Sequence, residues 1–600
     1  MDLNLLINIL DIFFWIIYML NVPRMLHIAQ LESYQNDGIF RWVTKNAKQA
    51  FKKGAMQFLI TGIVYLLSGL LIFILKDKIF ENSNSFLTMY LVRIPIVILA
   101  FVITNGINIV KDKKERKNAK KPLKYTSRAK RLMFSNFCIL AMLQVLFMGV
   151  IEGTFPNDIK ALNEVQRPYA ETYTDDEKYM EDVKNYVDSK LAYNEYNNRN
   201  YLVIQPILFS FLIFTIPVNM IIANWFASPT ETWINNRYIN KAKKKLSKKE
   251  YKDLIRIGIT GSYGKTSTKF ILKTILEERY NVLATPGSYN TTMGNVRIIR
   301  EQLKPEHQVF ISEMGARKKR DIQEICDFVK PHLGIITSIG AQHLETFKNI
   351  ETVAKTKAEL LNGVTEDGAV FLPKDNSHCL ELYKKDKHKK FLFSTKNDGS
   401  DVYAKNIKVT KEGSTFTVVT KKTQFECKTK LLGEHNVQNI IGCVAIADFL
   451  GLTKEEIQKG IEKIEPVEHR LQLIPSVNGT IVIDDAFNSN PVGSKMALDV
   501  IKQFEGRKII ITPGMVELGE EEYKLNKEFG AQMAGVVDFA ILVGIKRSKP
   551  IVEGLKSKKF NDMNIYVVNN LEEATKQLGK LTQAGDVILF ENDLPDNYNE

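Results

Sequence analysis

Residues 260–267, Thr-Gly-Ser-Tyr-Gly-Lys-Thr-Ser, combine the residue types that bind phosphate groups. A short apolar run precedes them and a helical pattern follows, which predicts a strand, a glycine loop and a helix. The backbone N–H groups of such a loop and the positive end of the helix form a nest for anions. Lys265 would reach the outer phosphates, and the Thr266 hydroxyl suits a magnesium ion. The usual phosphate loop has a further glycine where this chain has Ile259, so a chance turn is the alternative.

The elements that must position this loop follow an α/β pattern. From residue 254 onward, short apolar runs alternate with amphipathic helical segments, which is typical of βαβ units and a parallel sheet. With 600 residues the chain is too long for one hydrophobic core, so several domains are predicted. Its five cysteines are widely spaced and contain no Cys-x-x-Cys pair, which supports neither a disulfide framework nor a zinc site.

The first 226 residues differ from the rest because they contain five long apolar runs. Each run approaches the roughly 20 residues that a helix needs to cross a bilayer. The alternative, buried helices of a water-soluble domain, requires a polar side on each helix, and residues 62–75 have almost none. We therefore predict five transmembrane helices, at residues 3–20, 55–75, 86–110, 132–151 and 201–226. Arg93 lies inside the third run, where it either reaches the membrane interface or serves a function.

Charges in the loops predict the orientation of these helices. Residues 111–131 contain eleven Lys and Arg against two acidic residues, and residues 237–256 are again strongly basic. Basic loops stay in the cytoplasm, whereas the acidic loop 152–200 belongs outside. Five crossings then place the N-terminus outside the cell and everything after residue 226 in the cytoplasm. The first run lacks a basic flank and a small-residue cleavage site, so we expect it to be retained.

The predicted membrane orientation also explains the excess of basic residues in the chain. The chain carries 82 Lys and Arg against 68 Asp and Glu, a formal net charge of +14. Much of this excess lies in the predicted cytoplasmic loops, where it suits anionic lipid headgroups. Nucleic-acid binding usually places basic residues among aromatic ones on a folded face, and we do not expect it here. The predicted location is a cell membrane, with several crossings.

Several motifs after residue 254 resemble those of the Mur ligase family, the ATP-dependent amide ligases of peptidoglycan precursor synthesis. They follow the family's order as far as about residue 586. They are the loop at 260–266, the strand-end glutamate in 310–316, the histidine segment 336–345, the lysine segment 353–360, and the segments 375–376, 433–439, 468–470 and 484–491. The last segment resembles the Asp-Asp-x-Tyr-Asn-x-Asn-Pro of the D-alanyl-D-alanine-adding branch, so this branch is expected to be the nearest.

The resemblance implies roles for individual residues. The expected magnesium ligands are Thr266, Glu313 and His343. Contacts with ATP are expected from Gly261, Ser262, Tyr263, Gly264, Lys265, Thr266, Ser267, Asn376, Asn436, Asn439, Arg470 and Asp485. Substrate contacts are expected from Asn290, Thr291, Asn488 and Asn490. Catalytic roles are expected for Lys265, His343, Lys357 and Arg470, and Lys357 is expected to be carbamylated and to help hold the second of two magnesium ions.

Each role has a structural alternative. Glu313 ends an apolar strand, where carboxylates often form ion pairs, but parallel sheets bind ligands at the carboxyl ends of their strands, which favours the metal role. His343 follows a neighbouring strand and is otherwise a structural histidine. Lys357 is otherwise a solvated helix lysine. Asn436 and Asn439 are otherwise a helix cap with an exposed neighbour, and Arg470 is otherwise part of a surface ion pair.

The implied reaction joins a carboxylate to an amine at the expense of ATP. ATP converts the carboxylate into an acyl phosphate, while Lys265, magnesium and Arg470 balance the charge around the γ-phosphate. The amine then attacks the acyl phosphate and yields an amide, ADP and phosphate. Residues of two domains meet over one ATP, so we expect domain closure to gate the reaction and exclude water.

Two departures from the family concern the substrates. Membrane helices take the place of the soluble domain that binds a UDP-linked sugar, which suggests a lipid-linked muropeptide or another cell-envelope precursor as the carboxylate. Residues 590–595, Phe-Glu-Asn-Asp-Leu-Pro, stand where relatives carry a basic Lys-Gly-Ser turn. The pocket for the amine, an amino acid or a dipeptide, is therefore expected to differ.

Three functions fit these motifs. The first is a membrane-bound amide ligase of the cell envelope, the second is a poly-amino-acid or capsule-type ligase, and the third is a membrane nucleotide-binding protein without ligase activity. The intact set of Lys265, Glu313, His343, Arg470 and Asp485 favours an active ligase. A transporter is disfavoured because the five spans show no repeat.

The predicted chain is thus a multidomain protein. A five-helix transmembrane domain at 1–226 is followed by a basic cytoplasmic linker at 227–252. A central P-loop ATP-binding α/β domain at 253–465 and a Rossmann-like C-terminal α/β domain at 466–600 complete it. No oligomeric state is predicted.

Overall fold

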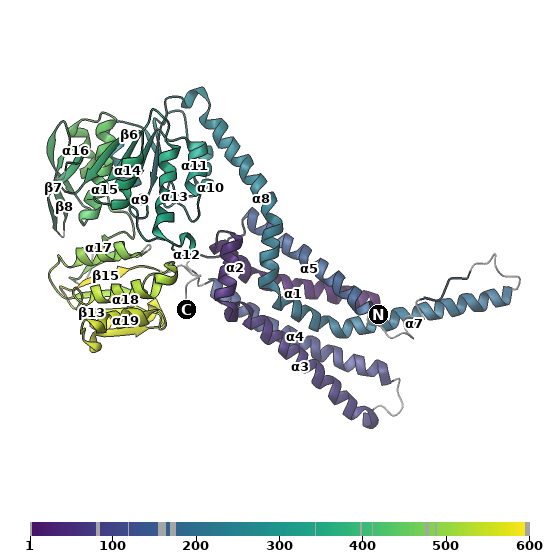
Figure 1. Cartoon of the computed structure of the whole chain (residues 1–600). Coiled ribbons are helices and arrows are strands. Elements are labelled where there is room, and N and C mark those ends of the chain that lie inside the picture. Colours follow the sequence, from purple (N-terminus) through teal and green to yellow (C-terminus); the bar gives the residue numbers. More distant parts are fainter. Residues whose placement is uncertain are drawn as a thin grey trace. The chain divides into compact units, whose positions relative to one another are not determined.

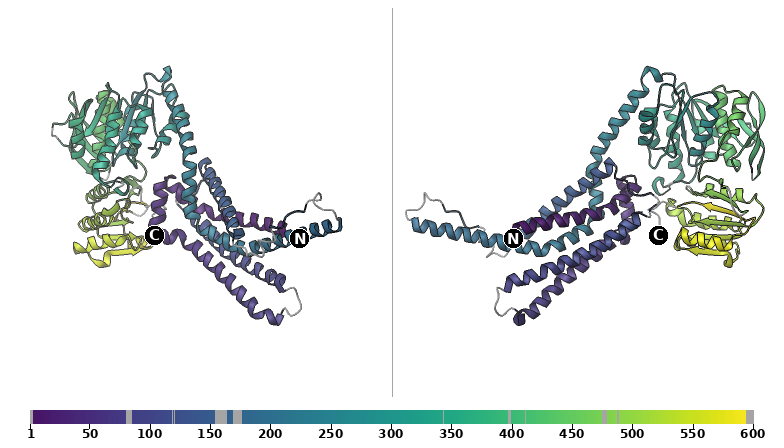
Figure 2. Two further views of the ribbon diagram at one scale, coloured as in Figure 1. Left: turned by 45° about the vertical axis from the view of Figure 1, so that its right-hand side comes forward. Right: turned by 180° about the vertical axis from the view of Figure 1, so that it is seen from behind.

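The computed structural model describes residues 3–79, 85–117, 119, 121–153, 164–168, 176–342, 344–396, 399–410, 412–474, 479–486 and 489–593. Two predicted site residues, His343 and Asn488, lie outside this part of the chain, so their roles stay predictions. The chain divides into two compact units, Met1–Trp233 and Ile234–Glu600. Long helices build the first unit, and two sheets flanked by helices build the second (Figures 1 and 2).

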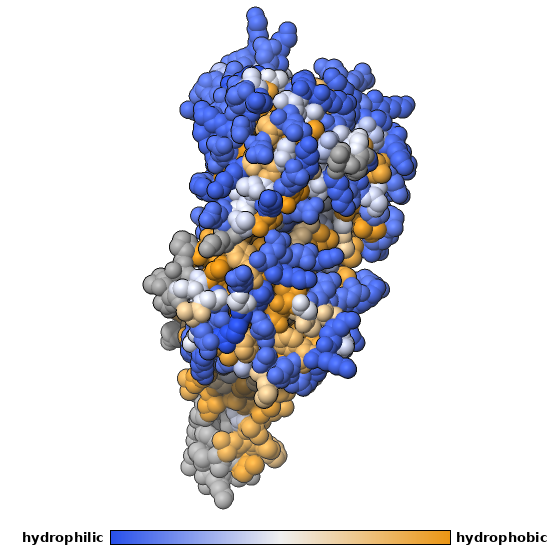
Figure 3. Space-filling model, turned by 90° about the vertical axis from the view of Figure 1, so that its left-hand side faces the viewer, coloured by the Kyte–Doolittle hydropathy of each residue, from blue (hydrophilic) through white to orange (hydrophobic). Residues whose placement is uncertain are grey.

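The first unit contains the apolar helices that the sequence predicts. Its helices are α1 (Leu3–Leu31), α2 (Asn36–Lys45), α3 (Ala47–Ile79), α4 (Ser85–Lys117), α5 (Ser127–Gly153), α7 (Asp176–Phe214) and the first part of α8 (Ile216–Leu246). Among the described residues, four stretches are long and apolar enough to cross a membrane: Leu5–Leu31, Ala47–Leu71, Arg93–Lys117 and Ser127–Val150. Figure 3 shows apolar residues gathered on the visible part of this unit, whereas the surface of the second unit is mostly hydrophilic.

The predicted fifth span is bent. Helices α7 and α8 meet at Thr215 at an angle of 64°, so they make a fifth span only if the bent pair crosses as one. Pro217 has no N–H for the carbonyl of Ile213, and its ring crowds the preceding turn, which accounts for the break. The Thr215 hydroxyl donates to the carbonyl of Leu212 (2.8 Å) and satisfies one of the groups that the break frees.

Two segments predicted to be loop and linker are helical. Helix α7 begins at Asp176, inside the predicted outer loop, and α8 continues through the predicted linker to Leu246. The last turns of α8 pack into the core of the second unit through Ile239, Ala242 and Leu246. The basic residues of this segment therefore lie on a helix that is anchored by its apolar side.

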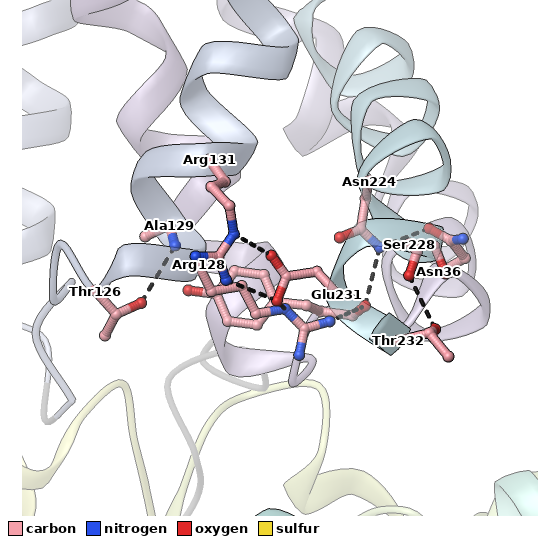
Figure 4. A network of polar contacts seen from close by, with 10 residues as sticks. Asn36, Thr126, Arg128, Ala129, Arg131, Asn224, Ser228, Glu231 and Thr232 are labelled. Carbon is pink, nitrogen blue, oxygen red and sulfur yellow. Dashed lines mark hydrogen bonds and ion pairs between the residues drawn. The ribbon is translucent and has the colours of Figure 1, made fainter. Parts of the chain in front are cut away.

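Polar side chains inside the first unit satisfy one another. Asp11 Oδ1 accepts hydrogen bonds from Tyr201 Oη (2.8 Å) and Gln144 Nε2 (2.9 Å). Arg131, near the start of α5, donates through Nη2 to Oε2 of the buried Glu231 in the middle of α8 (2.9 Å), as Figure 4 shows. Because lipid offers no hydrogen bonds, such pairs are needed wherever polar groups are buried between these helices.

Arg93 on α4 is held by contacts with the neighbouring helix α3. Its Nη2 donates to the carbonyl of Tyr65 on α3 (2.9 Å), and its guanidinium lies 3.8 Å from the centre of the Tyr65 ring. The charge is thus held by a carbonyl and an aromatic face on the neighbouring helix. These contacts favour a packing role.

The central domain of the second unit is built on a nine-stranded sheet. The order is β2-β3-β1-β4-β5-β6-β7-β8-β9, with parallel pairing from β2 to β7 and antiparallel pairing of β7, β8 and β9. The strands are β1 (Ile255–Thr260), β2 (Val282–Ala284), β3 (Val309–Glu313), β4 (Leu333–Ile336), β5 (Ala369–Pro373), β6 (Lys389–Ser394), β7 (Val402–Thr410), β8 (Gly413–Val419) and β9 (Gln424–Thr429).

Helices cover both faces of this sheet. They are α9 (Lys265–Leu276), α10 (Thr292–Glu301), α11 (Asp321–Val329), α12 (Leu344–Phe347), α13 (Ile350–Gly363), α14 (Ser377–Lys385), α15 (Glu434–Phe449) and α16 (Lys454–Glu462). Ile257 and Ile311 face the core formed with α9, α15 and α16. Phe310 and Val370 face the opposite core, formed with α10, α11, α13 and α14. Burial on both faces explains why the central strands are almost wholly apolar.

The C-terminal domain repeats this layering on a smaller scale. Its sheet has the order β10-β11-β15-β12-β13-β14, parallel except for the β10–β11 pair. The strands are β10 (Gln472–Ile474), β11 (Ile481–Asp485), β12 (Lys508–Thr512), β13 (Phe539–Val543), β14 (Ile565–Val568) and β15 (Val587–Glu591). The helices are α17 (Pro491–Ile501), α18 (Glu522–Met533), α19 (Ser548–Ser557) and α20 (Leu571–Leu581). The expected succession of two α/β domains after apolar helices is therefore present.

Candidate active site

The glycine loop lies at the carboxyl end of β1, between this strand and α9. Gly264 has a φ of 78°, and a Cβ at this position would lie 2.7 Å from Asn439 Oδ1. Gly261 has a φ of 151°, and a Cβ there would lie 2.0 Å from Thr337 Oγ1. Both glycines are required, because another residue would be strained and would meet atoms of α15 or of the segment after β4.

The segment after β4 holds the loop in place. The N–H of Ser262 donates to the carbonyl of Ser338 (2.8 Å), and the Ser262 hydroxyl donates to the carbonyl of Gly340 (3.1 Å). The Tyr263 hydroxyl donates to the carbonyl of Ala341 (2.7 Å). The loop after β1 is therefore held by the segment that follows the adjacent parallel strand β4, as expected for a ligand site at the carboxyl edge of a sheet.

Lys265 lies across this loop. Its Nζ donates to the carbonyls of Gly261 (2.7 Å) and Ser262 (3.3 Å). Burial lowers the pKa of Lys265 to about 8, the Glu313 carboxylate opposes this, and the Arg470 guanidinium adds to it. Arg470 belongs to the segment before β10, so its positive charge reaches the phosphate loop from the C-terminal domain.

Glu313 is the centre of a buried network at the end of β3. Its Oε1 accepts from Thr266 Oγ1 (3.1 Å) and Asn290 Nδ2 (3.1 Å), and its Oε2 lies 2.9 Å from Lys269 Nζ. Neither Lys269 nor Glu313 has an exposed side chain. Lys269 was not predicted from the sequence, although its position three residues after Thr266 places both on one side of α9.

The oxygen ligands suit magnesium held together with a phosphate. Among the described residues, no group of three or more His, Cys, Asp or Glu side chains is arranged to hold a metal ion. Magnesium keeps several waters and usually takes one or two protein oxygens in addition to substrate phosphates. The Thr266 hydroxyl and the Glu313 carboxylate, 3.1 Å apart beside the loop, fit this pattern.

Lys357 is also buried near the loop. It lies on α13 with an exposed fraction of 2%. Burial lowers its pKa well below the usual value, and the nearby positive charge of Lys265 adds to this effect. The alternative of a solvated helix lysine is thus wrong for this position.

A cavity of about 230 Å³ opens beside the glycine loop. Its lining residues are Tyr263, Gly264, Thr337, Ser338, Ile339, Asp375, Asn376, His435, Gln438, Asn439, Val492 and Met496. Burial lowers the pKa of His435 to about 4, so this imidazole is neutral near pH 7. The residues from α15 lie in the predicted motif 433–439, whereas Val492 and Met496 of α17 carried no signal in the sequence.

Three asparagines of the predicted site have different roles in the structure. Asn439 lines the cavity, and so does Asn376, which also caps α14 by accepting from the N–H of Cys379 (3.1 Å). Asn436 does not line it: its Nδ2 donates to the carbonyl of Leu432 (2.9 Å) and its side chain is buried.

Two predicted substrate residues are helix caps. Thr291 Oγ1 accepts from the N–H of Gly294 (3.2 Å) at the start of α10. Asn490 Oδ1 accepts from the N–H of Gly493 (2.8 Å) at the start of α17. Both side chains are used to begin a helix, which accounts for their residue types without a substrate. Asn290, in contrast, is bonded to Glu313.

In the C-terminal domain, acidic residues lie at the ends of β11 and β15. Burial raises the pKa of Asp485 to about 6, with the positive charge of Arg470 opposing this. Glu591 is paired in register with Asp485 and is 1% exposed. Its Oε2 accepts from Thr512 Oγ1 (2.8 Å), its Oε1 is bonded to the Ser489 hydroxyl, and burial raises its pKa to about 8.

The fold and the site together define a nucleotide-dependent enzyme of two α/β domains, with a phosphate loop in one and an arginine from the other beside it. Residues 259–447 match the Mur ligase middle domain, and residues 469–591 match the Mur ligase glutamate ligase domain. These segments make up more than half of the chain. The chain belongs to the Mur ligase family and is an ATP-dependent ligase that forms amide bonds. The family resemblance is confirmed.

Its relatives agree with the expected branch. The UDP-N-acetylmuramoyl-tripeptide–D-alanyl-D-alanine ligase of Haemophilus influenzae is 29% identical over 339 residues, which are 55% of this chain and 73% of that protein. The enzyme of the same name from Escherichia coli is 30% identical over 290 residues, 48% of this chain and 64% of that protein. The crystal structure of MurF from Acinetobacter baumannii matches with a TM-score of 0.56 and 26% identity over 61% of this chain and 78% of that one.

Proposed function

We propose that this chain is a membrane-bound ligase that joins a D-alanyl-D-alanine-like amine to a carboxylate of a peptidoglycan precursor. One observation carries the proposal: Arg470 of the C-terminal domain lies close enough to Lys265 and Glu313 of the central domain to shift the pKa of Lys265 and to be influenced by Glu313. A site for phosphoryl transfer needs such cations around the γ-phosphate.

The nucleotide substrate would occupy the loop and the cavity beside it. The N–H groups at the start of α9 and the ammonium of Lys265 would bind its phosphates. The base would enter the cavity of about 230 Å³, where Asn439 and the neutral His435 offer hydrogen-bonding groups. Thr266 and Glu313 would hold magnesium, which supplies countercharge to the phosphates.

The chain's own groups would then orient the reacting carboxylate and the amine. Lys265 and Arg470 would approach the transferred phosphoryl group from two domains, so their charges would act on it together only when the domains are close. Lys357 has an amine whose lowered pKa favours the neutral form, the form that adds CO₂. We propose carbamylation of Lys357 on this ground, together with the predicted second magnesium ion.

The membrane unit suggests the form in which the carboxylate arrives. The matches to relatives begin near the phosphate loop, and apolar helices precede it in this chain. A lipid-linked muropeptide would be concentrated at the membrane surface that such helices provide. We therefore propose a lipid-linked precursor as substrate, with the ligase unit in the cytoplasm and the N-terminus outside.

The test is ADP release by the full-length protein in detergent. Lipid-linked and UDP-linked muropeptides are each combined with D-alanyl-D-alanine or single amino acids, and product masses are measured. Lys265→Ala is the inactive control. Lys273→Ala, which changes a partly exposed lysine on the same helix α9, is the matched control. Turnover with a lipid-linked muropeptide and D-alanyl-D-alanine, lost only in Lys265→Ala, is expected.

Other results would contradict parts of the proposal. Turnover restricted to the UDP-linked acceptor would overturn the lipid-linked substrate. A ladder of products would indicate a poly-amino-acid ligase. ATP binding without turnover on any pair would exclude these muropeptides as substrates.

A further inference from the structure

His469 and Asp484 flank the site, and the proposed reaction uses neither. We propose that these two residues form a positioning pair that holds Arg470 toward the phosphate loop. The inference rests on the proposed role of Arg470 and adds two residues that act through it. His469 and Arg470 lie in the segment that leads into the C-terminal domain, and Asp484 lies in β11 of that domain. All three belong to the second unit.

The first observation is a short contact between the two side chains. His469 Nδ1 lies 2.6 Å from Asp484 Oδ2. The other oxygen of Asp484 accepts from the N–H of Ala486 (3.0 Å), so the carboxylate is fixed at the end of β11. Asp484 is nearly buried, whereas about half of the His469 side chain is exposed. The buried partner is thus a fixed anchor for the histidine.

The second observation is the backbone around Arg470. His469 has a φ of 60° and Leu471 a φ of 45°, so residues in the left-handed region stand on both sides of the arginine. Such conformations are strained for residues with a Cβ and persist where their surroundings hold them. The Asp484 contact holds His469, and the N–H of Leu471 donates to Asp485 Oδ1 (3.2 Å).

The third observation is that charge reinforces the contact. The hydrogen bond that Asp484 accepts raises the pKa of His469, and the negative charges of Asp484, Glu468 and Asp593 add to this. Glu468 Oε1 lies 3.7 Å from His469 Nε2 on the exposed side of the ring. Burial of the ring opposes this rise in pKa, but the three carboxylates outweigh it, so the protonated form is favoured as the donor to Asp484.

These contacts hold the backbone on both sides of Arg470. The imidazole side chain of His469 is bound to β11, and the following residue, Arg470, exerts its charge on Lys265 and Lys269. If the pair is broken, the strained backbone is free to relax and the guanidinium loses its fixed position. Misplacing a charged group by about 1 Å can reduce turnover by roughly a hundredfold.

The test is a double-mutant cycle on full-length enzyme, assayed with ATP and the muropeptide and amine that support turnover. His469→Asn removes the imidazole and with it the contact that holds the segment, while asparagine still tolerates a positive φ, so the fold is retained although the segment is no longer anchored. Asp484→Ala removes the anchor, and Asp484→Asn keeps an acceptor for Nδ1. Glu468→Gln is the matched control, because it changes the exposed neighbour of the same ring. Arg470→Lys keeps a positive charge at this position and is the second background in which His469→Asn is measured.

The expected result separates positioning from folding. His469→Asn and Asp484→Ala each lower kcat by about tenfold with little change in the KM for ATP. Asp484→Asn keeps one of the two acceptor oxygens and causes a smaller loss, while Glu468→Gln keeps most of the parental kcat. In the Arg470→Lys background, His469→Asn causes less than a twofold further loss. Thermal unfolding of His469→Asn remains that of the parent.

Several outcomes would overturn the inference. Equal losses from His469→Asn in both backgrounds would show that the histidine acts independently of Arg470. An unchanged kcat in His469→Asn would show that the contact is not needed. If Arg470→Lys has parental turnover while Lys265→Ala has none, the role of Arg470 fails and the ligase assignment stands. If Lys265→Ala is fully active, the proposed function itself fails.

Discussion

Lys269 Nζ lies 2.9 Å from Glu313 Oε2, and solvent reaches neither side chain. This ion pair links helix α9 to the end of strand β3. The same carboxylate accepts from Thr266 in the phosphate loop and from Asn290 after β2. One buried anion thus joins three segments of the site, and its geometry depends on a lysine that stands four residues after Lys265.

Removing this lysine should destabilise the central domain. Lys269→Met leaves Glu313 buried without its counter-charge, which costs about 3–5 kcal/mol of the free energy of unfolding. The melting temperature of the full-length protein should fall by several degrees, and the double variant Lys269→Met/Glu313→Gln should recover much of it. Lys273→Met breaks an exposed pair with Glu277 on the same helix and should cost less than about 1 kcal/mol. Equal effects of the two lysine variants would argue against the buried pair.

Thr266 should control the requirement for magnesium. Thr266→Val keeps the shape of the side chain and removes the hydroxyl that lies 3.1 Å from Glu313 Oε1. The magnesium concentration for half-maximal ADP release should rise about tenfold. Thr274→Val removes a hydroxyl that bonds only to the carbonyl of Phe270 in the described structure, on the same helix, and should leave the requirement unchanged. A parental magnesium profile in Thr266→Val would remove this hydroxyl from the ligand set.

Gly264 should be essential for nucleotide binding. Gly264→Ala would place a Cβ 2.7 Å from Asn439 Oδ1 at a φ of 78°, so the loop must shift. Calorimetric titration should show ATP bound at least about tenfold more weakly. Gly579→Ala is the matched control, because a Cβ in helix α20 meets no atom within 4 Å and should add stability. Unchanged ATP affinity in Gly264→Ala would show that the loop does not cradle the phosphates.

Glu591 should make the stability of the C-terminal domain depend on pH. Its pKa is about 8 in the folded protein against an ordinary glutamate value of 4.5, so the folded state keeps a proton that the unfolded chain releases. Between the two pKa values, 4.5 and about 8, the free energy of unfolding falls as pH rises, by up to about 1.4 kcal/mol per pH unit. Glu591→Gln keeps the neutral shape and should lose this slope between about pH 6.5 and 8.

Glu553 is the matched control residue for Glu591. Glu553→Gln changes an exposed side chain whose pKa is lowered by the Tyr523 hydroxyl, so it titrates well below this range. The melting temperature of Glu553→Gln should change with pH in the same way as that of the parental protein. Parallel profiles for Glu591→Gln and the parent would mean that Glu591 is ionised in the folded protein.

The proposed orientation can be measured by labelling. Lys178→Cys lies in the first turn of α7, and Lys248→Cys lies just after α8, both at exposed positions. A membrane-impermeant maleimide should label the cysteine at 178 in intact cells and the cysteine at 248 only after lysis. The parental protein, with its own five cysteines, sets the background. The reverse pattern would invert the proposed topology.

Local patterns in the sequence were sufficient to predict the helices of the first unit and the two α/β domains. Apolar runs of about 20 residues predicted the helices of the first unit, because such lengths need no tertiary information. Alternating strands and helices predicted two α/β domains, and the loop around Lys265 lies where a strand-to-helix turn places it. These features depend on spacing along the chain, and the sequence displays spacing directly.

Side-chain partners could not be predicted in this way. Asn436 and Asn439 stand one helical turn apart, yet Asn436 bonds to its own helix start while Asn439 lines the cavity. Thr291 and Asn490 have residue types that suit either a substrate or a helix cap, and the structure uses both as caps. The choice depends on the direction in which each side chain leaves the backbone.

By itself, the sequence determined the order of the domains, the place of the phosphate loop and the family to which the chain belongs. The tertiary structure alone decided that α7 and α8 bend at Thr215, that Lys269 neutralises Glu313, and that Glu591 lies beside Asp485. The physical reason is that burial and charge pairing arise between residues far apart in the chain. Their energies depend on which strands become neighbours and on how much water remains between them.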